Sequence, residues 1–258
     1  MKLKLVGVWL ACALWANSLA ASDNFGVFKR SLNDKQYGYQ KVSDPIDTNN
    51  LKWVERFEIR NGDCGFQTGW NDCETDRERS ELSQQTNRQK VGETYWYAWE
   101  IYFPIDYPSV YPAKTALGQF HQANGKPMFM FQNQTHSVKG NKDVYSGGYH
   151  LDWHSNQKSK GFWQLISEEE LRGKWHRIEV HAKWSKQSDG FFDVWIDGVQ
   201  KAAFNGQTIE KDQVYFKYGV YRSYISRYKQ AHNTEVMPTQ VVYYRNVVRG
   251  ESREDIQP

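Results

Sequence analysis

The sequence has little net charge, few cysteines and no apolar stretch long enough to cross a membrane. Its 33 Lys and Arg residues against 30 Asp and Glu residues give a formal net charge of +3. This balance argues against bulk nucleic-acid binding, where basic residues clearly outnumber acidic ones. The longest apolar run, Leu5 to Ala16, is shorter than the roughly 20 residues that a membrane-spanning helix needs. No internal repeat is visible.

The first 20 residues have the pattern of an export signal. Lys2 and Lys4 precede the apolar run, and Ser18-Leu19-Ala20 offers small residues for cleavage. Residues 1–20 are therefore predicted to be a signal peptide, which places the mature protein in the periplasm or outside the cell, without a membrane anchor. A lipoprotein attached through Cys12 is the weaker alternative, because Cys12 lies inside the apolar run. Loss of the signal removes two lysines and no acidic residue, so the mature chain is nearly neutral.

Cysteine is scarce, with three residues in the whole chain and two after signal removal. Cys64 and Cys73 lie in a segment rich in Gly, Asp and Asn, and in an exported protein this spacing predicts a disulfide that closes a small loop. Such a loop stabilises a fold by about 2–3 kcal/mol in the chain-entropy treatment. A metal site is the weaker alternative, because no second cysteine pair or spaced histidine pair accompanies them.

Aromatic residues, in contrast, are abundant, with 11 Trp and 16 Tyr in 258 residues. These flat, amphipathic side chains favour strands and suit surfaces on which sugars stack, although a β-rich core explains any single one equally well. The length permits one all-β domain or two small ones. Short strand-like segments follow one another with almost no helical periodicity, which indicates two packed antiparallel sheets. We expect one domain over residues 21–250 and a mobile charged tail over residues 251–258.

Three of these segments each direct polar side chains to one face. Alternation along a strand places Arg79 with Glu81, and Gln119 with His121. In the stretch 215–221 it places Tyr215, Lys217, Gly219 and Tyr221 on one side and Phe216, Tyr218 and Val220 on the other. Collected on one sheet, these polar residues would make a site for a carboxylated sugar. The polar face of the strand expected at 175–184 is a candidate extension of that site.

The same segments resemble a known group of enzymes. Arg79-Ser80-Glu81-Leu82, Gln119-Phe120-His121 and Tyr215-Phe216-Lys217-Tyr218-Gly219-Val220-Tyr221 resemble, in order, three signature strands of the family-seven alginate lyases. Gly173-Lys174-Trp175-His176-Arg177, Lys183-Trp184-Ser185 and the stretch 189–198 are similar to the glucuronan lyase and heparin lyase I group. The resemblance implies a β-jelly roll, a concanavalin-like two-sheet antiparallel sandwich whose concave sheet binds an anionic polysaccharide. We expect a monomer.

The resemblance also implies β-elimination at a uronic acid. The proton at C5 is poorly acidic, so the charge of the neighbouring carboxylate has to be offset, and Arg79 and Gln119 are the candidates. His121 or Tyr221 would take the proton, and Tyr221 would protonate the leaving glycosidic oxygen. Lys217 would lower the pKa of Tyr221 or bind a neighbouring uronate. No organic cofactor is required for this chemistry, and the resemblance allows for a structural Ca²⁺ whose ligands the sequence does not indicate.

Further residues are expected to bind substrate around this centre. Glu81 would orient Arg79 or Arg77, and the other candidates for substrate contact are Arg77, Tyr215, His150 and Arg222, with Lys183 and Arg227 as further basic candidates. The sequence departs from the alginate lyase pattern at Tyr218 and at Arg222-Ser223, which argues against assigning alginate as the substrate. The uronate thus stays open among glucuronate, mannuronate, guluronate and iduronate.

Two other classes of function compete with a lyase. A glycoside hydrolase on the same fold would need two carboxylates that flank the scissile bond, and the Glu-x-Asp-x-x-Glu spacing of laminarinase-like hydrolases is absent from the sequence. A non-catalytic glycan-binding module would explain the aromatic residues and the sheets without requiring His121 or Tyr221.

Overall fold

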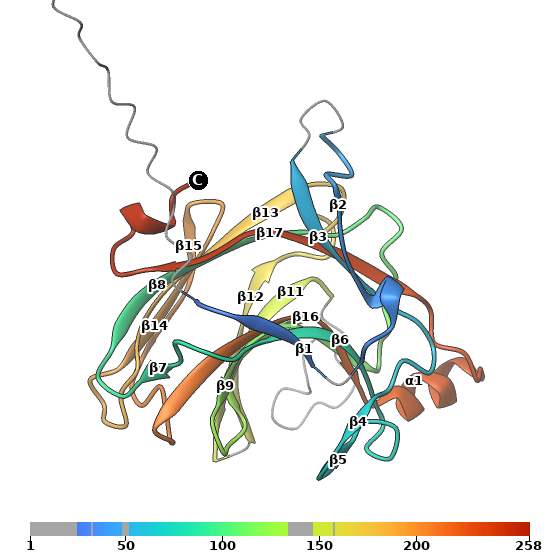
Figure 1. Ribbon diagram of the computed structural model, residues 1–258, viewed down its shortest axis with the longest axis horizontal. Helices are drawn as coiled ribbons and strands as arrows, with labels where there is room; N and C mark the ends of the chain where they lie inside the picture. The colour runs from blue at the N-terminus through green and yellow to red at the C-terminus, as the bar shows by residue number, and fades with distance from the viewer. Residues whose placement is uncertain (1–24, 32, 48–51, 134–146, 157) are drawn as a thin grey trace, which may run out of the picture.

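Two large antiparallel sheets pack face to face in this computed structural model (Figure 1), which describes the chain except for residues 1–24, 32, 48–51, 134–146 and 157. The predicted signal peptide lies outside the described residues. The first sheet has the order β1-β6-β16-β9-β10-β11-β12, with β7 on β16, and the second has the order β15-β14-β13-β8-β17-β3-β2. Both sheets bend in the same sense (Figure 1), which leaves the outward face of the first sheet on the inside of the bend.

The first sheet consists of β1 (Phe28–Ser31), β6 (Arg77–Gln84), β7 (Gln89–Lys90), β9 (Lys114–Gln122), β10 (Pro127–Asn133), β11 (Tyr149–Ser155), β12 (Lys158–Ile166) and β16 (Gln213–Ser223). The second consists of β2 (Tyr39–Ser43), β3 (Trp53–Ile59), β8 (Thr94–Tyr102), β13 (Trp175–Lys183), β14 (Phe191–Ile196), β15 (Val199–Asn205) and β17 (Gln240–Gly250). A separate hairpin joins β4 (Phe66–Gln67) to β5 (Trp70–Asn71), and the described helices are η1 (Gln36–Gly38), α1 (Ile225–His232) and η2 (Glu254–Ile256). The predicted all-β sandwich is confirmed.

Aromatic side chains fill the space between the sheets. Phe216 and Phe120 from the first sheet meet Trp99 and Trp184 from the second, with ring centroids 4.9 to 5.2 Å apart for Phe216–Phe120, Phe216–Trp99 and Phe120–Trp184. All four are fully buried. Large, rigid rings that contact both sheets fix the separation of the layers, so this core supports the outward face of the first sheet as a stable platform.

The C-terminal segment is packed against the second sheet, contrary to the mobile tail expected from the sequence. Ile256 is buried, and its carbonyl accepts a hydrogen bond of 2.5 Å from Arg177 Nη2. Arg253 pairs with Glu179 at 2.7 Å. Arg177 and Glu179 belong to the polar face of β13, which was expected to extend the candidate site. That face instead belongs to the other sheet, away from the site, and binds the tail.

No helix in the described part of the chain is both long and apolar enough to cross a membrane.

Candidate functional site

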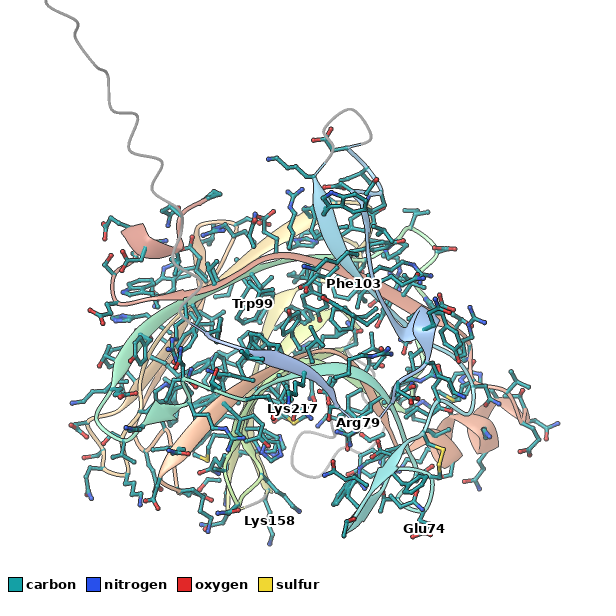
Figure 2. All side chains as sticks on the ribbon, viewed as in Figure 1. Glu74, Arg79, Trp99, Phe103, Lys158 and Lys217 are labelled. Carbon is teal, nitrogen blue, oxygen red and sulfur yellow. A yellow bond between two sulfur atoms is a disulfide. The ribbon has the colours of Figure 1, made fainter. Side chains whose placement is uncertain are left out.

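Strand β16 lies between β6 and β9 and brings the three predicted polar pairs together. Tyr221 is opposite Arg79 on β6, while Lys217 and Tyr215 are opposite Gln119 and His121 on β9. The alternate residues of β16 point into the core and are buried. Figure 2 shows Arg79 and Lys217 close together on the outward side of this sheet. The prediction that these segments share one surface is therefore confirmed.

Glycine is needed at position 219 for this arrangement. Gly219 has φ of +125°, and a Cβ atom there would lie 2.4 Å from the Ser80 carbonyl oxygen on β6. At the same place β16 carries one extra residue relative to β9, because the register shifts between Tyr218 and Tyr221. Such a bulge re-aims the side chains that follow it. The motif glycine thus sets the position of Tyr221 relative to Gln119 and His121.

Glu81 connects the cationic and amide side chains of the site. Its carboxylate accepts hydrogen bonds from Lys217 Nζ at 2.6 Å, Gln119 Nε2 at 2.5 Å and Arg79 Nη1 at 3.3 Å. Burial would raise the pKa of Glu81, but the charges of Lys217 and Arg79 outweigh it and hold that pKa below its usual value. Burial also lowers the pKa of Lys217, so its ammonium charge depends on Glu81. The predicted orienting role of Glu81 thus extends to three partners.

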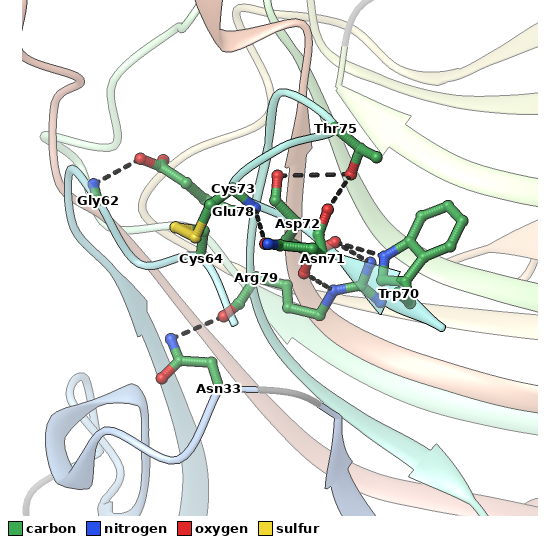
Figure 3. The surroundings of a disulfide bond; sticks show 10 residues. All are labelled: Asn33, Gly62, Cys64, Trp70, Asn71, Asp72, Cys73, Thr75, Glu78 and Arg79. Atoms are coloured by element: carbon green, nitrogen blue, oxygen red, sulfur yellow. Dashed lines mark hydrogen bonds and ion pairs between the residues drawn. A yellow bond between two sulfur atoms is a disulfide. The ribbon is translucent and has the colours of Figure 1, made fainter. Parts of the chain in front are cut away.

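Arg79 is held by a residue that the sequence did not single out. Asp72, fully buried, accepts two hydrogen bonds from Arg79, 2.5 Å from Nε and 2.7 Å from Nη2. Asp72 belongs to the loop that the Cys64–Cys73 disulfide closes, and Figure 3 shows this loop beside Arg79. The predicted disulfide is confirmed. Asp72 takes Nε and one N–H of Nη2, and Glu81 takes one N–H of Nη1, so each terminal nitrogen of Arg79 keeps one further N–H. The sequence feature that could have identified Asp72 is its position as an acidic residue within the predicted disulfide loop.

Tyr221 keeps its phenolic proton at neutral pH. The Arg79 guanidinium carbon lies 4.4 Å from the centre of the Tyr221 ring, a cation–π contact. Burial raises the pKa of Tyr221 to about 12, and the opposing charges of Arg79 and Arg77 only partly offset it. A protonated phenol held in this way is suited to donate a proton.

His121 is neutral and keeps one ring nitrogen free to accept a proton. Its Nδ1 lies 2.9 Å from the Gln122 carbonyl oxygen, which can only accept, so Nδ1 carries the hydrogen and Nε2 has the lone pair. Burial, and next the charge of Lys217, lower the pKa of His121 to about 4. The ring packs on Tyr215 with centroids 5.1 Å apart. The arrangement fits a general base.

A second residue that the sequence analysis missed, Arg88, lies beyond Tyr215. Its guanidinium carbon is 4.7 Å from the centre of the Tyr215 ring, and it is half-buried. Together with Gln85, Lys90 and Gln213 it lines an open cavity of about 690 Å³. The Tyr215 ring, which contacts both Arg88 and His121, thus connects this cation to the proposed base.

Two predicted substrate-binding residues are not supported. Arg222 is fully buried and points into the core, where it pairs with Glu78 and donates to the Arg60 carbonyl oxygen at 3.0 Å. Position 222 follows Phe216, Tyr218 and Val220 in the alternation, so this inward direction could have been read from the sequence. His150 lies on the outward side of β11 but is also fully buried, with Nε2 2.8 Å from the Gly147 carbonyl oxygen.

Two of the departures from the alginate lyase pattern, Tyr218 and Arg222, therefore carry less information than expected, whereas Ser223 lies opposite Arg77 on the face of Tyr221. Tyr218 is buried, and its hydroxyl donates to Glu55 at 2.8 Å, behind the sheet. Since Tyr218 and Arg222 both point inward, neither can contact a sugar on the outward face, and they do not argue against alginate. The further basic candidates lie elsewhere. Lys183, on the second sheet, pairs with Asp189 at 2.6 Å, and Arg227, in α1, lies 4.0 Å from the centre of the Tyr224 ring.

Among the described residues, no group of three or more His, Cys, Asp or Glu side chains is arranged to hold a metal ion. The structural Ca²⁺ that the resemblance allowed for therefore has no candidate group of three acidic side chains in that part of the chain.

Comparisons with known proteins agree with this architecture. Residues 20–248 match the sequence profile of a family described as polysaccharide lyase. The sequence has no significant match among curated proteins. In structure the chain is similar to an endo-β-1,4-glucuronan lyase from the fungus Trichoderma reesei, with a TM-score of 0.60 and 16% identity over 90% of this chain and 97% of that one.

Two alginate lyases are also similar in structure. Alginate lyase AlgAT5 from polysaccharide lyase family 7 has a TM-score of 0.55 and 16% identity over 86% of this chain and 93% of that one. A substrate-bound form of the family 7 alginate lyase A1-II′ has a TM-score of 0.53 and 13% identity, covering 90% of this chain and 97% of that one. At such identities the likeness establishes a shared fold, the jelly-roll sandwich.

Proposed function

Because the chain belongs to the polysaccharide lyase family, we propose that it cleaves a uronic-acid-containing anionic polysaccharide by β-elimination and releases unsaturated oligosaccharides. The observation that carries the proposal is the pairing of a neutral histidine with a protonated tyrosine on one face. The charges of Glu81 and Arg79 influence the pKa of both His121 and Tyr221, which supports a joint role for the two residues beside one ionic cluster.

The reaction divides between these two residues. His121 Nε2 takes the proton from C5, the electron pair forms the C4=C5 double bond, and the bond from C4 to the glycosidic oxygen breaks. Tyr221 donates its proton to that oxygen, which leaves as a hydroxyl group. Where proton and leaving group lie on the same side of the sugar, Tyr221 alone can do both. Where they lie on opposite sides, a histidine base and a tyrosine acid are the natural pair.

The charge of the sugar carboxylate is offset by donors at the centre of the face. Arg79 keeps one N–H on each terminal nitrogen, and the Gln119 amide and Lys217 ammonium each keep N–H groups beyond those that bind Glu81. Hydrogen bonds to a carboxylate strengthen as negative charge builds up on it during proton removal, so these donors favour the transition state over the ground state. Arg77 and Tyr215, at the two ends of the face, would contact neighbouring sugars.

The acidic residues of the site do not support a hydrolase. Hydrolysis requires one carboxylic acid to protonate the bond and a second carboxylate to act as nucleophile or base. Glu81 and Asp72 are both buried, and their oxygens accept hydrogen bonds from Lys217 and Arg79. Neither is available to a sugar. A binding module that lacks catalysis would retain affinity for the glycan but form neither unsaturated product nor new reducing ends.

The proposal is tested by following ultraviolet absorbance while the purified mature protein acts on glucuronan, alginate, hyaluronan and heparin-type chains. Elimination creates a double bond conjugated to the carboxylate, which absorbs where the intact polymer does not. We expect absorbance to rise on one of these polymers, which identifies the uronate. New reducing ends without absorbance would instead indicate hydrolysis and contradict the proposal.

The pH dependence of kcat/KM should follow His121. The acidic limb is expected near pH 4 rather than 6.5, because burial and Lys217 lower the pKa of the base. Replacing Lys217 by Met removes one of the causes, so the limb should move upward in that variant. If the acidic limb has the same pKa in Lys217→Met, the limb reports the titration of another group or of the substrate.

The lowered pKa of His121 also makes folding stability depend on pH. As pH falls, His121 is protonated in the unfolded chain near pH 6.5 but in the folded protein only near pH 4, so the stability associated with the neutral ring is lost between these values.

We further propose that residues 1–20 export the protein to the periplasm or the medium, where such polymers occur, and that the mature protein acts as a monomer. The pattern of the first 20 residues and the disulfide support export.

A further inference from the structure

We propose that Trp70 and Arg77 form an accessory subsite for a second uronate, beside the one that is cleaved, with Trp70 as the platform for the sugar ring and Arg77 as the partner of its carboxylate. This inference rests on the proposed function and adds Trp70, which the motif strands do not contain, to Arg77, the first residue of β6. Trp70 lies in the hairpin β4–β5, within the loop closed by the Cys64–Cys73 disulfide.

Trp70 is exposed and yet held in place. The residue keeps 41% of its surface exposed, while its indole Nε1 donates a hydrogen bond of 2.8 Å to Asp72. Asp72 in turn binds Arg79, so Figure 3 shows an unbroken set of contacts from the indole to the centre of the site. A single exposed aromatic residue is common on protein surfaces. Trp70 differs because the buried carboxylate of Asp72 fixes the orientation of its ring, which is therefore pre-organised for stacking.

Arg77 supplies a positive charge that no acidic side chain neutralises among the described residues. Arg79 is neutralised by Asp72, and Lys217 by Glu81. The Arg77 guanidinium instead lies 5.1 Å from the centre of the Trp70 ring and donates to the Thr75 carbonyl oxygen at 3.1 Å. Contact with an aromatic ring leaves a guanidinium edge able to bind a carboxylate with two hydrogen bonds.

The chemistry of this pair matches a uronate specifically. A neutral sugar would use only the ring platform, and a small anion would use only the guanidinium, whereas a uronate offers an apolar ring face and a carboxylate together. Arg77 is opposite Ser223, and this pair is the next one on the same face after the Arg79–Tyr221 pair. Two residues along a strand correspond to roughly 7 Å. The subsite therefore receives a neighbour of the cleaved sugar, on the Tyr221 side of the site.

The test compares Michaelis parameters of Trp70→Ala, Trp70→Phe and Arg77→Gln on the uronan that the unmodified protein cleaves. Trp70→Ala is expected to raise KM about tenfold with a smaller effect on kcat, since stacking acts on the bound polymer and not on the bond that breaks. Trp70→Phe retains a ring but loses the bond to Asp72, and it should keep most of the affinity. Arg77→Gln should raise KM and weaken its dependence on salt.

Phe66→Ala is the matched control, because Phe66 is 79% exposed in the same hairpin but alternates with Gln67, the partner of Trp70, and so faces the other way. Its KM should be unchanged. If Trp70→Phe is as damaging as Trp70→Ala, Trp70 acts only by holding Asp72 and the subsite does not exist. Equal KM values for Trp70→Ala and Phe66→Ala would also contradict the proposed subsite.

The proposed function and the subsite can fail separately. If the unmodified protein forms no unsaturated product from any of the polymers, the proposed function is wrong, and the subsite is then tested by affinity electrophoresis in gels containing the same uronans. Weaker retardation of Trp70→Ala than of Phe66→Ala would support the subsite. Equal retardation would refute it.

Discussion

Tyr221→Phe is expected to reduce the rate of elimination by about 10²- to 10⁴-fold, the contribution typical of a positioned general acid. The substitution removes only the hydroxyl group, so the ring keeps its contact with Arg79, 4.4 Å from the guanidinium carbon. Folding should therefore be unchanged, and substrate affinity should change little. The initial rate of ultraviolet absorbance, together with KM, measures the effect.

Tyr215→Phe provides the matched control, because Tyr215 lies on the same face of the same strand and also packs against an arginine, Arg88. We expect only a modest effect from it, since its hydroxyl has no role in the proposed proton transfers. Comparable losses in both variants would contradict the assignment of Tyr221 as the acid. His121→Ala then shows which residue removes the C5 proton. If His121→Ala remains active while Tyr221→Phe does not, Tyr221 carries out both proton transfers.

Glu81→Gln should produce the largest loss of stability among single substitutions in the site, about 3–5 kcal/mol. The change leaves Lys217 buried beside a neutral amide, and an uncompensated buried charge is costly. Arg79 keeps its ion pair with Asp72. Burial already lowers the pKa of Lys217, so part of the cost can be relieved by loss of its proton. Urea denaturation at neutral pH measures the free energy of unfolding.

The matched control for Glu81→Gln is Asp212→Asn, which removes the acid from an exposed pair with Lys186. There we expect a much smaller loss, because solvent screens the charges. The double substitution Glu81→Leu with Lys217→Met should recover stability relative to Glu81→Gln, since no lysine charge is then buried. A loss no larger for Glu81→Gln than for Asp212→Asn would mean that the buried network does not stabilise the fold.

The acid dependence of stability offers a second check on Glu81. Its pKa in the folded protein lies below the usual value of 4.5, so its contribution is fully present above that pH and is lost as pH falls below it. The Glu81→Gln variant should lack this part of the acid-induced loss. Unfolding free energies measured from pH 6 downward for both proteins would show a difference that shrinks with falling pH.

What the sequence by itself determined is the direction of side chains within each strand. Alternation along a strand is a local property of the backbone, so Tyr215, Lys217 and Tyr221 could be assigned to one face, and Phe216 to the other, before any neighbour was known. The same rule already directs Arg222 into the core, and the prediction that it binds substrate overlooked it. The disulfide, too, followed from the two cysteines of an exported chain.

Only the tertiary structure decided which strands are neighbours, because pairing joins segments far apart in the chain through hydrogen bonds that leave no periodic mark in the sequence. Strand β16 lies between β6 and β9, which gathers Arg79, Gln119 and Lys217 around Glu81, whereas β13, with an equally polar face, belongs to the other sheet and binds the C-terminal segment. Burial is a collective property for the same reason. Asp72 reaches Arg79 only because the loop folds back over the first sheet, and this long-range contact determines how much of the arginine remains for substrate.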